Sequence, residues 1–351
     1  MSASRPPVTA PADEDTGDDT ASDTASAAGQ GSALRRGMAV LVLLLLAALV
    51  PLLGPDLALR GTGEADTPGV GLVTLLRTVT FGALCVLAGQ AAEGWLIRRV
   101  PDAPAPRPAN WSVTAACVGA VAAVWLALIV ANGNIPPDSL AELTPGRLWQ
   151  TTDGRLALLE VNAFIAAGFC AQTRRAGSAF LPLSVVVGAE ALRAHPGIGP
   201  EENPLLGSGL TLVHLTSAAL WAGGLLWVLR ALRLWRGRPV QSGVLLGLYA
   251  RVAALLFAAI TASGICSTLR KLPLESVFSS AYGRVLVAKL LLVVVIAGLA
   301  VMARIRLGRK GAGAAAVPAK AEVVVLGLAV AVSALLTAVP APIWWVPPLW
   351  G

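Results

Sequence analysis

The chain has 351 residues, of which 56% are hydrophobic and only 13% are charged. Soluble domains carry about one quarter charged residues, so this composition excludes a soluble globular protein and predicts an integral membrane protein in a lipid bilayer. The formal net charge of +7 does not predict a nucleic-acid partner, because the Lys and Arg residues cluster between apolar segments, where they set membrane topology.

Residues 1–34 differ in composition from the rest of the chain. They are rich in Ser, Thr, Ala and Asp and hold almost no large apolar side chains, so they cannot bury enough surface to fold. We therefore expect a disordered acidic tail. A cleaved secretory signal is not expected, because the first apolar segment follows a long acidic stretch rather than a short basic one.

The remainder, residues 35–342, reads as one all-α polytopic membrane bundle. A bilayer core about 30 Å thick needs roughly 20 apolar residues per helix. Nine segments qualify, although the first, fourth and fifth are short, and eight spans is the alternative if the first is only an anchor. The predicted spans are 36–53, 71–97, 111–131, 155–173, 178–194, 208–229, 246–268, 281–304 and 321–339.

The basic residues predict the orientation of these spans. Lys and Arg collect in alternate loops, and the loops between them are richer in Asp and Glu. Because positive loops face the cytoplasm, the N-terminus should be cytoplasmic, in the cell membrane, and residues 343–351 should lie outside. The basic loops are marked by Arg35 and Arg36, by Arg98 and Arg99, by Arg174 and Arg175, by Arg230 to Arg238, and by Arg304 to Lys310.

The chain contains only two histidines, and both fall near the predicted outer face. His195 ends the fifth predicted span, and His214 lies about two turns into the sixth, across a loop rich in Gly and Pro. Imidazole is a common ligand for transition metals, so the pair predicts a metal or cofactor site that is reached from the extracytoplasmic side. Either histidine alone could instead be a hydrogen-bonding residue between helices.

The sixth predicted span carries a polar face. His214, Ser217 and Trp221 recur at i, i+3 and i+7, which places them on one side of a helix. Gly223 and Gly224 follow, and small residues let a neighbouring helix approach closely. Trp221 could line a site or serve only in packing.

The eighth predicted span carries a second set of candidates. Tyr282 and Lys289 stand at i and i+7, with Arg284 near the outer edge. An ammonium group inside the membrane is costly, so Lys289 should face the bundle interior or a wet cavity with a partner. Glu160 and Glu190 are the candidate partners, and both a transport role and a structural ion pair are open for Lys289.

The four cysteines are less informative. They stand singly in apolar segments with no CxxC pair, which indicates neither a disulfide framework nor a thiolate zinc site. Cys266, at the outer end of the seventh span, is a further candidate copper ligand. The simpler reading of all four is that they are small apolar residues within helices.

Three stretches of the chain together resemble the CopD family of copper-resistance membrane proteins. These are HLTSAALWAGGL (214–225), the Ser-Gly of ITASGICSTL (260–269), and SAYGRVLVAKLLLVVVIAGLAVMAR (280–304). The last span, introduced by Glu322, is also similar. The resemblance is strongest over 180–342 and looser over 70–180. At His195 the family usually has a Gly-His pair, and here Ala194 replaces the glycine.

The resemblance implies copper homeostasis: copper is bound at the outer face by His195 and His214 and is moved across the membrane or handed over there. Trp221, Tyr282, Arg284, Lys289 and Glu190 would support the site through cavity lining or charge pairing. The family implies a partner such as an extracytoplasmic copper carrier or a copper enzyme under assembly.

Two other functions stay open. Two axial histidines could hold a haem for electron transfer, and the protein could be a non-catalytic membrane assembly factor. An enzyme is not expected, since the sequence has no HExxH, GxSxG or paired-carboxylate signature at a plausible site.

Overall fold

The computed structural model describes most of the predicted bundle. Every regular element within the described residues is helical, which confirms the all-α prediction. The expected tails, 1–34 and 343–351, lie outside the described residues. The described residues are 48–64, 68–137, 139, 145–173, 177–194, 204–272 and 274–339.

Six of the described helices are long and apolar enough to cross a membrane, namely α2, α3, α5, α7, α8 and α9. The chain is therefore a multi-pass membrane protein, while the count of nine and the orientation stay predictions. A shorter apolar helix, Ala48–Leu59, overlaps the end of the first predicted span. The elements are α2 Val70–Ile97, α3 Ser112–Ala131, α4 Arg147–Gln150, α5 Thr152–Gln172, α6 Phe180–Arg193, α7 Pro204–Leu234, α8 Pro239–Lys271, the 3-10 helix η2 Leu274–Ser276 and α9 Ala281–Ala338.

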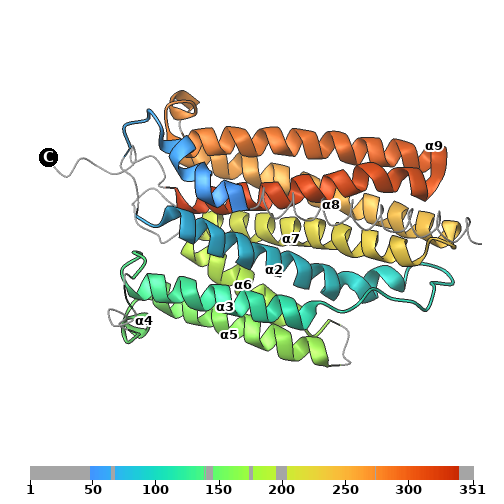
Figure 1. Cartoon of the computed structure of the whole chain (residues 1–351), viewed down its shortest axis with the longest axis horizontal. Helices are drawn as coiled ribbons and strands as arrows, with labels where there is room; N and C mark the ends of the chain where they lie inside the picture. The colour runs from blue at the N-terminus through green and yellow to red at the C-terminus, as the bar shows by residue number, and fades with distance from the viewer. Residues whose placement is uncertain are drawn as a thin grey trace, which may run out of the picture. The chain divides into compact units, whose positions relative to one another are not determined.

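Helix α9 contains two of the predicted spans, 281–304 and 321–339. The residues between them are helical apart from a break at Gly311, where φ is 78° and ψ is −178°. That conformation is essentially restricted to glycine, so Gly311 allows the chain to turn back. The two arms of α9 then pack together as a hairpin, drawn in orange and red in Figure 1. The residues that join the arms include Ala281, Val285, Val332 and Leu335.

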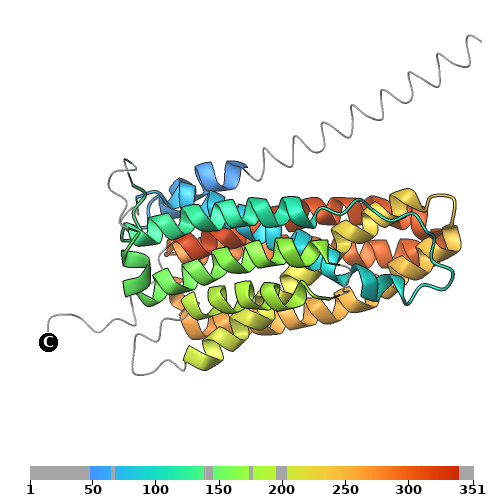
Figure 2. The ribbon, with the colours of Figure 1, turned by 90° about the horizontal axis from the view of Figure 1, so that it is seen from below.

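Helices α2 and α7 form the middle of the bundle. They pack extensively on each other, with α3, α5 and α6 on one side and α8 and α9 on the other, as the order of the ribbons in Figure 1 shows. Figure 2 views the molecule from the side of α3, α5 and α6. The bundle therefore has two flanks joined by the α2–α7 pair.

The contact between α2 and α7 depends on glycine. A Cβ atom added at Gly223 would overlap the backbone of Cys85 and Gly89, and one added at Gly89 would overlap the backbone of Gly223. The two helices thus meet backbone to backbone, where no larger side chain fits. The predicted close approach at Gly223 is confirmed.

Candidate functional site

His214 lies where α7, α8 and α9 meet. Its Nδ1 is 3.1 Å from the Ser263 Oγ of α8, and its Nε2 is 3.3 Å from the Lys289 Nζ of α9. Gly264 of α8 lies beside the ring, since a Cβ there would be in ordinary van der Waals contact with His214 Cε1, at 3.5 Å. Three helices thus converge on one partly buried imidazole.

The hydrogen bonds around His214 define the role of each ring nitrogen. Ser263 Oγ donates to backbone carbonyls of its own helix, at 2.7 Å to Ala259 O and 3.1 Å to Ile260 O. Because its own hydrogen is directed there, the hydroxyl oxygen accepts a hydrogen bond from Nδ1–H of the ring. Nε2 then carries the lone pair, which accepts from the ammonium of Lys289. In this arrangement Nε2 is the ring nitrogen that is available to a metal ion.

Lys289 faces the bundle interior, as its position in an apolar span requires. Its partner differs from the expectation, because neither Glu160 nor Glu190 contacts it in the described part of the chain. Instead, Arg193 of α6 binds both carboxylates, at 2.9 Å to Glu160 Oε2 and 3.2 Å to Glu190 Oε1. These residues lie on the α5–α6 flank, whereas His214 of the central helix α7 faces α8 and α9, where Lys289 lies.

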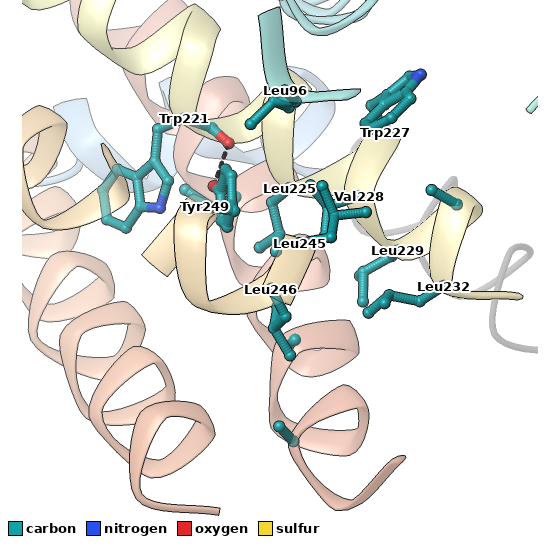
Figure 3. Packing of buried hydrophobic residues seen from close by; sticks show 14 of the residues in the cluster. Leu96, Trp221, Leu225, Trp227, Val228, Leu229, Leu232, Leu245, Leu246 and Tyr249 are labelled. Atoms are coloured by element: carbon teal, nitrogen blue, oxygen red, sulfur yellow. Dashed lines mark hydrogen bonds between the residues drawn. The ribbon is translucent and has the colours of Figure 1, made fainter. Parts of the chain in front are cut away.

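Trp221 lies two turns further along the same face of α7 and is 4% exposed. Its indole Nε1 donates to Glu322 Oε1 of α9 at 3.2 Å, and its carbonyl accepts from the Tyr249 hydroxyl of α8 at 2.7 Å. The ring also packs edge-on against Phe257, with centroids 5.5 Å apart. Figure 3 shows the Tyr249 bond beside the apolar cluster of α7 and α8. Trp221 therefore contacts the same helices as His214, α8 and α9, about two turns further along α7.

Tyr282 and Arg284 stand at the start of α9, away from the imidazole. Arg284 donates to the backbone, at 2.6 Å to Arg60 O and 3.2 Å to Phe278 O. Tyr282 occupies the first turn of α9. No hydrogen bond links either residue to His214 within the described ranges, so the expectation that both shape the site gains no support.

His195 and its loop, 195–203, lie outside the described residues. The pairing of the two histidines therefore stays a prediction. Among the described residues, no group of three or more His, Cys, Asp or Glu side chains is placed to hold a metal ion. Cys266 is exposed on α8, and no hydrogen bond joins it to His214 in the part of the chain that is described.

A cavity of about 300 Å³ lies between α2, α7 and α8. It is lined mainly by apolar residues, and it is not formed by the predicted set of Tyr282, Arg284 and Lys289. Tyr249 connects this cavity to Trp221 through the hydrogen bond described above. The lining includes Ala91, Trp95, Leu220, Gly224, Tyr249 and Leu256.

Comparison with protein families gives one match. Residues 243–339, which run from α8 through both arms of α9, match the family model of CopD, copper resistance protein D. The resemblance to CopD is confirmed over this segment. It contains Ser263, Lys289 and Glu322, while His214 and Trp221 of α7 lie outside it. No curated protein matches the chain, and no solved structure does either.

The sequence pattern missed several residues that the structure brings to these sites. Ser263 belongs to the quoted Ser-Gly motif, but the sequence alone did not place it against His214. Arg193 stands three residues after Glu190 on one helix, a spacing at which opposite charges meet. That spacing is the signal that could have predicted the ion pair. The contact of Tyr249 with the Trp221 carbonyl has no local sequence signal.

Proposed function

We propose that this protein handles copper at the cell membrane, binding the ion at a site that contains His214 and then moving or handing it over. Copper is the cargo, and the proposal requires no catalysis. The observation that carries it is the position of His214: two of the three helices around the ring belong to the CopD segment. An imidazole lone pair at Nε2 is a suitable donor for either copper oxidation state.

The predicted orientation puts this site toward the extracytoplasmic side. His214 is ten residues from the start of α7 at Pro204, which is about 15 Å at 1.5 Å per residue. A copper ion arriving from an extracytoplasmic carrier, or leaving for a copper enzyme, would reach His214 from that end. In this proposal His195, in the adjoining loop, supplies a second imidazole.

Lys289 would act as the resident cation of the site. Its ammonium group contacts the nitrogen that a copper ion needs. Entry of copper therefore requires Lys289 to move aside or to give up a proton. Binding with such competition is weaker but more easily reversed, which suits a protein that passes its cargo on.

A second candidate is a membrane assembly factor in which His214 only joins helices. The assembly role is favoured by the hydrogen bonds that Ser263 and Lys289 form with the two ring nitrogens. The two candidates differ in whether the purified protein binds copper at all.

The test is copper binding to the purified protein in detergent, compared with His214→Ala, His195→Ala and Cys266→Ala. The proposal expects the parent to bind copper, each histidine variant to lose most of the affinity, and Lys320→Gln, an exposed change on α9, to bind as the parent does. Loss of copper affinity in Cys266→Ala would show that the Cys266 thiolate is a further copper ligand. Equal copper binding by the parent and by a variant that combines His195→Ala with His214→Ala would refute the copper site. A Soret band in the absorption spectrum of the purified protein would indicate haem instead.

A further inference from the structure

The α5–α6 flank holds a second group of buried charges, apart from His214. Arg193 binds Glu160 through Nη2 and Glu190 through Nη1, with N···O distances of 2.9 Å and 3.2 Å. The exposed fractions of the three side chains are 10% for Arg193, 1% for Glu160 and 7% for Glu190. We refer to these three residues as the carboxylate pair and its arginine.

The charges of this group do not balance when every member is ionised. One guanidinium faces two carboxylates, and an arginine side chain does not lose its proton in proteins. One negative charge would then remain buried in a membrane-spanning bundle, where an uncompensated charge is very costly. Two carboxylates that share one site do not readily ionise together.

Two atoms of the group, Glu160 Oε1 and Arg193 Nε, also lack a hydrogen-bond partner among the described residues. Glu160 Oε1 is buried and forms no hydrogen bond with any described residue. The other oxygen of the same carboxylate binds Arg193, so the unpaired oxygen is positioned by a contact that fixes the side chain. A buried carboxylate oxygen without a donor is costly unless a hydrogen is supplied to it.

Within the described residues, no second basic side chain forms an ion pair with Glu160 or Glu190. Arg193 is the basic partner in both ion pairs of the group, and the remaining ion pair among the described residues joins Arg107 to Glu93 elsewhere. Asp153, in the first turn of α5, also acts on Arg193 and adds negative charge. The other charged or titratable side chains on α5 and on elements packed against α5 and α6 are Arg147, Arg155, Arg77, Glu93, Cys85, Cys117, Cys170, His214, Arg230 and Arg233.

We propose that Glu160 and Glu190 hold one exchangeable proton between them, so that the carboxylate pair and its arginine form a proton-binding site. The proton neutralises the excess charge and supplies the hydrogen that one of the carboxylate oxygens lacks. Release of the proton leaves two buried carboxylates beside one guanidinium and weakens the contact of α5 with α6. The site does not depend on copper or on His214.

The test uses the purified full-length protein without copper and follows its thermal unfolding as the pH is raised from neutral to alkaline values. The unfolding temperature of the parent should fall as the proton is lost, because stability depends on protons that the folded state binds. Glu160→Gln and Glu190→Gln each leave one carboxylate for Arg193, so each should remove most of this fall. Glu93→Gln, which changes the other ion-paired carboxylate, should behave as the parent does.

Infrared spectroscopy of the same samples gives an independent measurement. The carbonyl band of protonated carboxylic acids should be present in the parent and should be weaker in Glu160→Gln and in Glu190→Gln, since either change removes the need for a shared proton. The proposal would be overturned if the unfolding temperature fell equally with rising pH in the parent, in Glu160→Gln and in Glu190→Gln. So would stabilisation of the parent by sodium at constant pH, because an inorganic cation would then neutralise the pair.

Discussion

His214 is restrained on both sides of its ring, and the two restraints have different consequences. Ser263 fixes the orientation of the imidazole through Nδ1, at 3.1 Å. Lys289 places a positive charge 3.3 Å from the nitrogen with the lone pair. The first contact would prepare the ring for a metal, while the second would compete with that metal.

Substitution of Lys289 therefore separates these two effects. If copper binds at Nε2, Lys289→Gln should raise the copper affinity by roughly tenfold, equivalent to about 1.4 kcal/mol, because the charge that competes with the ion is removed. The measurement is a competition titration of purified protein with a copper chelator. Lys320→Gln is the matched control, since Lys320 is an exposed lysine on the same helix. Weaker copper binding in Lys289→Gln would mean that the lysine supports the bound ion and does not compete with it.

Trp221 and Glu322 illustrate what could not be obtained from residue patterns. The i, i+3, i+7 spacing placed His214 and Trp221 on one face of a helix, and both contact α8 and α9 in the structure. The spacing could not say which side chains of other helices they meet. Those partners, Ser263 and Glu322 among them, are 49 and 101 residues away along the chain, and only the packing of the helices brings them together.

Among the elements, α2 and α7 depend most on small residues. Gly223 stands against the backbone of Cys85 and Gly89, where an added methyl group has nowhere to go. Because membrane helices associate mainly through close packing, this contact should contribute strongly to the stability of the bundle.

We therefore expect Gly223→Ala to lower the stability by about 1–3 kcal/mol or more, the usual cost of overpacking. Thermal unfolding in detergent would measure the effect. Gly247→Ala on α8 is the control, since a Cβ at Gly247 meets nothing within 4 Å, and alanine is about 1 kcal/mol more favourable than glycine in a helix. A Gly223 variant as stable as the parent would show that the helices separate easily at this crossing.

The boundaries of the elements show which part of the fold could be predicted from composition. The second and third predicted spans, 71–97 and 111–131, nearly coincide with α2 and α3, because an apolar segment of membrane length has few alternatives to a helix. The predicted boundaries are wrong where a helix contains charged residues. Residues 305–320 carry several charges and were left between spans, yet they are helical apart from Gly311.

Helices α7 and α8 show the same limit. They extend from Pro204 to Leu234 and from Pro239 to Lys271, beyond the predicted spans 208–229 and 246–268. The turns added at the C-terminal ends, 230–234 and 269–271, carry Arg and Lys residues, which lower their hydropathy. Hydropathy therefore detects the part of a helix inside the lipid, and it does not detect where the helix ends.

At the scale of the whole molecule, the direction of copper handling depends on which end of the bundle faces out. The basic residues near α7 and α8, Arg230 to Arg238, predict a cytoplasmic loop at one end. Residues 132–151, before α5, are predicted to lie at the other end, where α7 begins. If the orientation were reversed, the end nearer His214 would open to the cytoplasm, and the proposed donor and acceptor of copper would exchange places.

Labelling of single cysteines tests this orientation in intact cells. In a variant whose four native cysteines are replaced by alanine, Gln150→Cys and Gly237→Cys place one thiol at each end. Gln150 is an exposed residue of α4, and a Cβ at Gly237 meets nothing within 4 Å. A membrane-impermeant maleimide should label Gln150→Cys in intact cells, and Gly237→Cys only after permeabilisation. The reverse pattern would place the N-terminus outside and make His214 a site reached from the cytoplasm, so the copper proposal would describe export from the cell and not capture.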